Sequence, residues 1–205
     1  MILCGKAITF EVRLKEIEEG IKPESIEIIV NPKEALETEY RLLKSAKDEV
    51  LMIFSTVNTF LLQERQLGIT QILTNLSMQG VSIKILTPID KDIEELVFKL
   101  KNQQEEQRYQ HQEQGQQLQP YQKNNAGKST NTNNTNSNID IQDIAPSSSI
   151  NAKILVVDKQ NSLAMEIKDG TKDELHDTIG LSTYSTTKST IASYFAIFEN
   201  LSKQN

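Results

Sequence analysis

The stretch Asn151-Ala152-Lys153-Ile154-Leu155-Val156-Val157-Asp158 decides what this chain can be. Its centre is a nearly continuous apolar run, which is typical of a buried β-strand. Three polar residues punctuate the run, because Lys153 lies two positions after Asn151 and Asp158 lies five positions after Lys153. A turn at Gln160-Asn161 and a second strand over 162–168 are predicted to follow.

This spacing resembles the His-x-Lys-x4-Asp motif of the phospholipase D superfamily, with Asn151 at the histidine position. Residues 180–185 resemble the Gly-Ser-x-Asn segment that follows the motif, and the resemblance extends over 26–201. In that superfamily the histidine of the motif attacks phosphorus, the lysine neutralises phosphate oxygens and the aspartate fixes the imidazole ring. An amide nitrogen is not basic and cannot replace the imidazole. The resemblance therefore implies a phosphodiesterase fold without phosphodiesterase chemistry.

Several short stretches resemble the accessory domain that precedes the kinase core in many archaeal (thaumarchaeal) signal-transduction histidine kinases. These stretches are 16–21, 31–32, 54–56, 156–158, 180–185 and 188–190. The sequence contains neither a phospho-acceptor helix nor an ATP-binding glycine box, so the kinase reaction itself is not expected. The chain is then either a stand-alone module or a fragment of a sensor kinase.

Strand and helix patterns alternate upstream of the motif. Apolar runs predict strands at 26–30, 50–54 and 81–86. Helices are expected from Asn31-Pro32 to 47, with Leu36, Tyr40 and Leu43 as the buried stripe, and over 58–79 and 91–107. Short connections between such elements are typical of a parallel sheet. We expect an α/β domain over 25–203 with a mixed, largely parallel sheet flanked by helices, which the resemblance equates with a single phospholipase D-like half-domain.

Residues 1–24 are predicted to form an N-terminal linker or dimerisation segment. Phe10, Leu14, Ile17 and Ile21 recur at helical spacing within it, which predicts an amphipathic helix from about residue 7. Two interpretations stay open at this point. The helix either caps the fold or joins this chain to a partner or a neighbouring domain.

Residues 102–138 form a polar insertion that divides the domain in sequence. Of these 37 positions, 10 are Gln and 8 are Asn, and Leu118 is nearly the sole aliphatic residue. Such a composition buries too little apolar surface to offset the entropy of ordering, so we expect a disordered loop. A tolerated insertion is favoured over a partner-binding tract, because long surface loops cost little stability.

The expected binding site gathers polar residues around the degenerate motif. In parallel sheets, ligands bind at the carboxyl ends of the strands. The expected ligand-binding residues are Asn151, Lys153, Asp158, Ser55, Thr56, Asn58, Ser182 and Thr183. With one lysine, this pocket would suit a small anionic ligand. In the simpler alternative, Lys153 is a sheet-edge residue and Asp158 forms a turn.

The remaining chemistry offers little for catalysis. His111 lies in the Gln-rich loop, and His176 lies in the acidic stretch 173–177. Neither has metal-ligand spacing to another His or to Cys4, so no metal and no cofactor are expected. Gly127-Lys128-Ser129 lacks the upstream glycine of a P-loop. His176 is the candidate substitute nucleophile if the chain is a phosphodiesterase or nuclease after all.

Composition sets outer bounds on partners and location. A net charge of -6 without a Lys/Arg cluster argues against nucleic acid as a partner. A single cysteine excludes a disulfide framework and agrees with a reducing compartment. No apolar window approaches a membrane span, and the first residues do not resemble a signal peptide. We therefore predict a soluble, cytoplasmic protein.

The segment 186–203 predicts an apolar C-terminal helix that is either buried or covers a second subunit. Phospholipase D domains with a single motif normally form a two-fold dimer or pair with a second half in the same chain, so the resemblance favours a homodimer, with burial in the core as the alternative for this helix. Together these features favour a non-catalytic sensory module, or pseudoenzyme, that binds a ligand or a histidine kinase partner. A phosphodiesterase with a substituted nucleophile is the alternative, and a purely structural remnant is the third.

Overall fold

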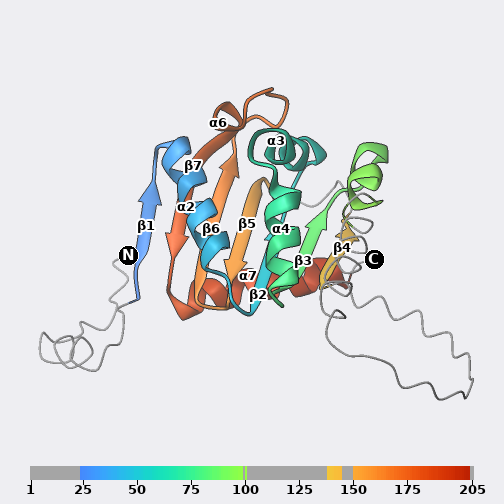
Figure 1. The fold of residues 1–205 in the computed structure, drawn as a ribbon. Coiled ribbons are helices and arrows are strands. Elements are labelled where there is room, and N and C mark those ends of the chain that lie inside the picture. The colour runs from blue at the N-terminus through green and yellow to red at the C-terminus, as the bar shows by residue number, and fades with distance from the viewer. Residues whose placement is uncertain (1–23, 99, 101–137, 145–149, 204–205) are drawn as a thin grey trace, which may run out of the picture.

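A seven-stranded mixed sheet forms the centre of the computed structural model, which describes residues 24–98, 100, 138–144 and 150–203. Its strands are β1 (Ile26–Ile29), β2 (Glu49–Ile53), β3 (Ser82–Thr87), β4 (Ile139–Asp143), β5 (Ala152–Val157), β6 (Asn161–Ile167) and β7 (Ile179–Ser185). Their order across the sheet is β1-β7-β6-β5-β2-β3-β4 (Figure 1). The predicted α/β class with a mixed sheet is confirmed.

Parallel pairing is confined to one side of the sheet. The β2–β3 and β3–β4 pairs are parallel, whereas β1–β7, β7–β6, β6–β5 and β5–β2 are antiparallel. The parallel share is therefore smaller than the sequence predicted. The β5–β6 pair is a hairpin whose tight turn spans 157–160, where the Gln160 amide donates to the Val157 carbonyl at 3.0 Å. A turn this short can join only antiparallel strands, because parallel strands need a longer crossover connection.

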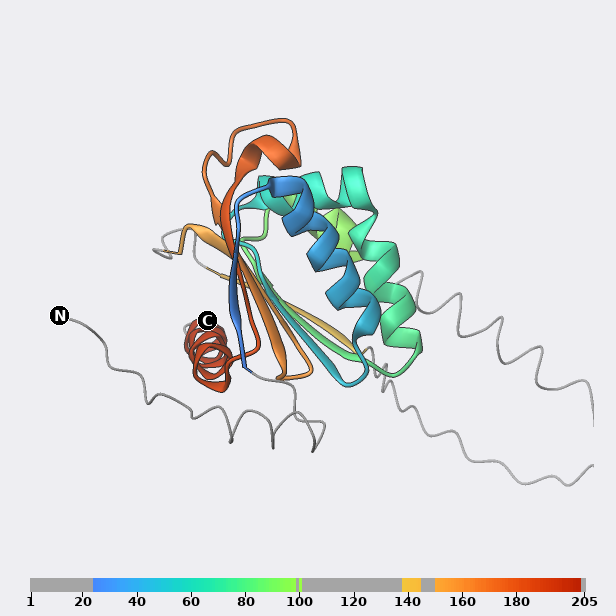
Figure 2. The ribbon, with the colours of Figure 1, turned by 90° about the vertical axis from the view of Figure 1, so that its left-hand side faces the viewer.

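Helices cover the two faces of the sheet unequally. On one face lie α2 (Pro32–Ser45), α3 (Val57–Leu67), α4 (Ile69–Met78) and the helical residues 91–98. On the other lies α7 (Lys188–Ser202), and the short α6 (Leu175–Thr178) sits at one end of the sheet (Figure 2). Two hydrophobic cores result, one between the sheet and the α2–α4 layer and one under α7.

Local sequence signals explain where the helices begin. The Asn31 side chain accepts from the Lys33 amide at 3.0 Å, and Pro32 occupies the first turn of α2. The Thr56 hydroxyl accepts from the Thr59 amide at 3.2 Å and caps α3 in the same way. Both caps lie just after a strand, so they also fix where the chain leaves the sheet.

The single helix predicted over 58–79 is wrong, because Gly68 divides it into α3 and α4. Gly68 has φ 59 and ends α3 in the left-handed conformation that glycine adopts without steric cost. The Glu64 carboxylate then accepts from the amide and the hydroxyl of Thr70, at 2.9 and 2.7 Å. These bonds supply the cap of α4 that Gly68 cannot provide.

Some predicted elements lie outside the described residues, and some elements of the structure were not predicted. The N-terminal helix of 1–24, the insertion 102–138 and the helix end beyond residue 100 lie outside the part of the chain that the structure describes. Strands β4 and β7 and helix α6 were not identified from the sequence. The predicted C-terminal helix is present as α7, and of its residues Ile191 and Phe198 are buried against the sheet.

Candidate functional site

The motif lysine lies in the middle of the sheet, on the face covered by α2–α4. The Lys153 side chain is 1% exposed, and its ammonium group bonds to the Glu39 carboxylate of α2. Glu39 is equally buried and accepts through Oε2 from Gln63 Nε2 of α3 at 2.7 Å. We call these three side chains the Lys153–Glu39–Gln63 cluster. It joins one strand to the two helices above it.

Aromatic rings complete the surroundings of the cluster. The Lys153 ammonium lies 5.1 Å from the centroid of the Phe54 ring, which itself stacks on Phe60 at 4.6 Å. Burial lowers the pKa of Lys153 below its ordinary value, while the charge and the hydrogen bond of Glu39 oppose this shift. The charge of the Lys153 ammonium group is compensated by the Glu39 carboxylate inside the protein, and this group is not accessible to solvent. The interpretation of Lys153 as a sheet-edge residue is wrong, since β5 lies between β2 and β6.

The motif aspartate lies at the opposite end of β5 and accepts hydrogen bonds from backbone amides. The Asp158 carboxylate accepts from the backbone amides of Lys47, Asp48 and Glu49, with Oδ1 2.8 Å from the Asp48 nitrogen. Asp158 and Lys159 both have positive φ, at 51 and 54, as the tight turn between β5 and β6 requires. Asp158 thus fixes the loop between α2 and β2, which supports its interpretation as a turn former.

The polar residues after β2 hold a neighbouring loop in place. The Thr56 and Thr59 hydroxyls lie 2.6 Å apart at the start of α3. Asn58 donates to the carbonyls of Gly170 and Lys172, at 2.7 and 3.0 Å. The Ser55 hydroxyl is buried without a hydrogen-bond partner among the described residues. The carboxyl end of β2 is therefore tied to the loop before α6.

The other expected site residues are spread over both faces of the sheet. Ser182 pairs with Met165, which pairs with Lys153, so Ser182 shares the face of Lys153 two strands away. Its hydroxyl is buried and has no partner within the described ranges. Thr183 is the next residue and points to the face of α7. Asn151 is exposed before β5, and its carbonyl accepts from the Ile167 amide at 3.0 Å.

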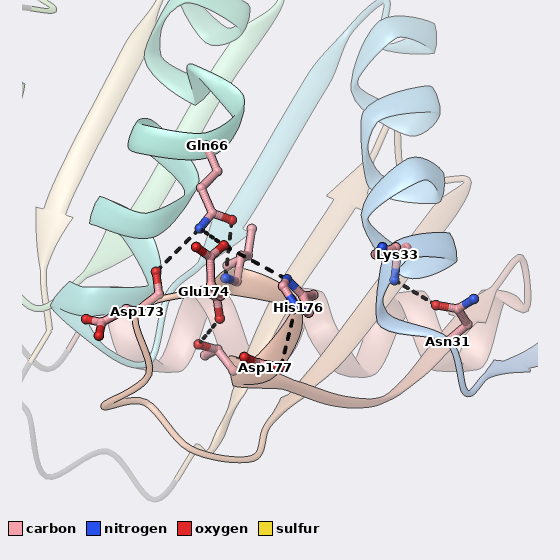
Figure 3. Close-up of polar contacts among 9 residues, drawn as sticks. Asn31, Lys33, Gln66, Asp173, Glu174, His176 and Asp177 are labelled. Carbon is pink, nitrogen blue, oxygen red and sulfur yellow. Dashed lines mark hydrogen bonds and ion pairs between the residues drawn. The ribbon is translucent and has the colours of Figure 1, made fainter.

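A polar cluster surrounds α6 at the same end of the sheet (Figure 3). Gln66 donates to the Glu174 carboxylate at 2.8 Å and accepts from the Leu175 amide at 3.2 Å, which docks α6 on α3. The His176 side chain is 45% exposed, and its Nε2 lies 3.5 Å from the Asp177 carboxylate. His176 thus lies at the surface among acidic side chains. In the described part of the chain, no interaction joins it to Lys153.

The residues that sequence reasoning missed are Glu39 and Gln63. Both lie on helix faces that pack on the sheet, between apolar neighbours that are also buried. No group of three or more His, Cys, Asp or Glu side chains able to hold a metal ion occurs among the described residues. Within the same residues, no helix is long and apolar enough to cross a membrane.

Comparison with known proteins identifies the fold class. No protein-family model matches the sequence, and no curated protein matches it either. The structure is similar to NucT from Helicobacter pylori, with 10% identity over 87% of this chain and 96% of that chain and a TM-score of 0.51. It is also similar to Nuc from Salmonella typhimurium, a phospholipase D family member, with 14% identity over 87% of this chain and 94% of that chain and a TM-score of 0.50. The fold is phospholipase D-like, as the sequence resemblance implied.

The exclusion of nucleic acid as a partner is corrected here, because net charge is not a sufficient ground for it. A third similar structure is that of TrmBL2, an archaeal chromatin protein with a novel mode of DNA binding. The match has 12% identity over 93% of this chain and a TM-score of 0.49, and this chain spans 57% of that protein. The prediction failed because a net charge sums over all residues, whereas DNA binding depends on where Lys and Arg lie on the surface. A total of -6 does not exclude a nucleic-acid partner.

Proposed function

We propose that this chain is a non-catalytic module of phospholipase D-like fold that binds a ligand or a partner protein in archaeal signal transduction. The pairing of Lys153 with Glu39 is the observation that carries the proposal. Phosphoryl transfer in the superfamily needs a nucleophile and a cation that can reach the phosphate. Here an amide replaces the nucleophile, and the cation is buried against a carboxylate of the same chain.

The same pairing decides where a ligand would not bind. An anion could reach Lys153 only by displacing Glu39, which would leave a carboxylate buried with one hydrogen bond from Gln63. The cost of an unpaired buried charge is about 3–5 kcal/mol. The module would therefore bind elsewhere on its surface, and we place no anion on Lys153.

The signalling part of the proposal rests on the stretches that resemble histidine kinase accessory domains, among them 54–56 and 180–185. In such an architecture the module would lie in the cytoplasm, associate as a homodimer and act on a kinase in the same or another chain. Native mass spectrometry of the purified protein tests this through the subunit number and any small molecule retained.

Hydrolysis of bis(p-nitrophenyl) phosphate and of single-stranded and duplex DNA tests the absence of catalysis. The matched control combines Lys153→Met with Glu39→Gln, which removes both charges and keeps an acceptor for Gln63. We expect the wild type and this control to show the same background rate without added metal. Turnover in the wild type that disappears in the control would overturn the proposal.

A phosphodiesterase with a substituted nucleophile is equally consistent with the fold, and one feature of the structure keeps it testable. His176 is a partly exposed imidazole at the end of the sheet where β5 begins. If it acted as the nucleophile, His176→Ala would abolish hydrolysis and His176→Asn would not restore it. Equal background rates in wild type and both variants would exclude this alternative.

A further inference from the structure

An open groove runs along α7, between this helix and the tight turn that joins β5 to β6. It has a volume of about 380 Å³ and is lined by Lys159, Lys188, Ile191, Ala192, Phe195 and Ala196. The lining residues of α7 follow one another at steps of three, one, three and one, so they form one continuous stripe along the helix. Helix α7 contacts β3, β5 and β6 with its inner side, and none of the described elements packs on its outer side (Figure 2). We call this site the α7 groove.

The floor of the α7 groove is apolar because short side chains lie beside two bulky ones. Ile191 is 5% exposed and Phe195 is half-buried, and both pack in the core under α7. Ala192 and Ala196 are exposed on the same stripe. A surface helix normally places polar or charged residues at such exposed positions. The two methyl groups instead leave the edges of Ile191 and Phe195 open to a ligand.

Two lysines and no carboxylate belong to the residues that line the α7 groove. The Lys159 side chain is 62% exposed, and its ammonium group lies 5.1 Å from the centroid of the Phe195 ring. Its ion-pair partner is Glu49, at 3.4 Å, and this carboxylate also pairs with Lys84 at 3.2 Å. Lys188 is exposed and forms no ion pair with a described residue. The groove thus carries positive charge on a chain whose net charge is -6.

We propose that the α7 groove binds a small organic anion, a monocarboxylate whose apolar body is best matched by an aromatic ring. The apolar body would lie on Ile191 and Phe195, and the carboxylate would lie between the ammonium groups of Lys159 and Lys188. A mostly apolar lining with a few polar groups is typical of small-molecule sites. The volume holds about a dozen non-hydrogen atoms, if each takes about 30 Å³ as a water molecule does in the liquid.

The size of the groove favours such a ligand over a macromolecule. A stable protein interface involves about 20–30 residues on each side, whereas six residues line this groove. Nucleic acids are held by Lys and Arg contacts to several phosphates, and two lysines supply too few of them. The inference deepens the ligand-binding part of the proposed function, on which it rests. It places the ligand on the opposite face of the sheet from Lys153.

Titration of the full chain with cinnamate, followed by amide NMR spectra, tests the proposal. We expect saturable shifts of the amides of Lys159 and of residues 188–196. The dissociation constant should be about 4 mM or lower, because an ordinary ligand efficiency gives this affinity to a ligand of cinnamate's size. Cinnamamide has the same shape without the charge. It should bind about tenfold more weakly, since each exposed ion pair contributes at most about fivefold.

Two pairs of variants locate the binding site. Ala196→Glu places a carboxylate in the groove and should abolish binding of cinnamate. Its matched control is Ser193→Glu, which places the same charge at an exposed position of α7 outside the lining and should leave the dissociation constant within about twofold. Lys159→Met combined with Lys188→Met should weaken binding about tenfold. The control for this pair is Lys203→Met, because Lys203 is 72% exposed at the other end of α7.

The absence of saturation at a cinnamate concentration about tenfold above the expected dissociation constant would overturn the proposal. Shifts centred away from α7, or equal affinities for cinnamate and cinnamamide, would overturn it too. If residues 188–196 shifted on raising the protein concentration alone, with a dimeric mass by light scattering, the groove would be an interface between two copies and the proposal would fall. Failure of this site leaves the absence of catalysis untouched, whereas hydrolysis by the wild type overturns the proposed function whatever binds here.

Discussion

Stepwise neutralisation of the Lys153–Glu39–Gln63 cluster gives the most direct test of whether the motif lysine is now part of the core. The first variant is Lys153→Met, the second adds Glu39→Leu and the third adds Gln63→Leu. Each replacement keeps a side chain of similar size in a position that is at most 1% exposed. Changes in the free energy of unfolding therefore report on charge and hydrogen bonding more than on volume.

The expected energies follow from the partners that each variant leaves behind. Lys153→Met leaves Glu39 charged, buried and bonded to Gln63 alone, which costs about 3–5 kcal/mol. Adding Glu39→Leu removes that charge and leaves Gln63 as the unsatisfied group, at a cost of about 1–3 kcal/mol. Its Oε1 already lacks a partner among the described residues. The triple variant should be neutral or more stable than wild type by about 1–4 kcal/mol.

Chemical denaturation followed by far-ultraviolet circular dichroism measures these values, since the chain has no tryptophan. The control is Lys84→Met, because Lys84 is 40% exposed and its 3.2 Å ion pair with Glu49 is open to solvent. Its loss should change the free energy of unfolding by no more than about 1 kcal/mol. If Lys153→Met cost as little as this control, the buried ion pair would not exist as described. If the triple variant stayed as unstable as the first, the cost would lie in shape, and the charge argument would fail.

Three further predictions concern pH, the motif aspartate and the insertion. Burial lowers the pKa of Lys153 in the folded state below the ordinary 10.5, so between the folded and the unfolded pKa the unfolded chain binds more protons than the folded one. The free energy of unfolding of the wild type should therefore rise with pH in that window. A pH series of denaturation curves should show this rise in the wild type and not in the triple variant. Asp158→Ala should lower the free energy of unfolding by about 1–3 kcal/mol because three backbone amides lose their acceptor, and Asp158→Asn should lose less; equal stability of both variants and wild type would contradict the turn assignment. Replacing 103–137 by a short Gly/Ser linker should leave the melting temperature within a few degrees, since loop closure costs about 0.6 kcal/mol per doubling of length, and loss of folding would show that the insertion packs on the domain.

Much of the order of strands and helices could be predicted, because most of these elements carry a local signal. The Asn31-Pro32 pair gives the start of α2, and apolar runs give β2, β3 and β5. The break at Gly68 could not be located with the same certainty, because a glycine inside a helical pattern is tolerated at a cost of about 1 kcal/mol. Strand β4 lacks a long apolar run, and it is ordered by pairing with β3, which lies far away in sequence.

The site could be predicted in part, because the motif identified Lys153 but not its partners. The stripe expected on α2 was Leu36, Tyr40 and Leu43. In the structure Leu43 is buried and Leu36 is partly buried, and the other buried residues of the helix are Ala35, Thr38, Glu39 and Leu42. The helix is thus rotated from the expected orientation, and Tyr40 is 41% exposed. A rule that keeps carboxylates out of cores selects the wrong face here, because it treats each helix separately from the strand below.

Considering strand and helix together would have found the pair. A lysine in the middle of an apolar strand can stay charged in two ways, either by reaching solvent or by meeting a carboxylate. The stripe that contains Ala35, Leu42 and Ala46 also contains Glu39, so one rotation of α2 buries the most small and aliphatic residues and supplies the missing counter-ion. The attraction between Lys153 and Glu39 offsets the energy that burial of each charge costs, and neither residue would be expected in a core without the other. Because the Glu39 carboxylate holds the Lys153 ammonium group, Glu39→Gln is the change expected to make Lys153 available to an anion.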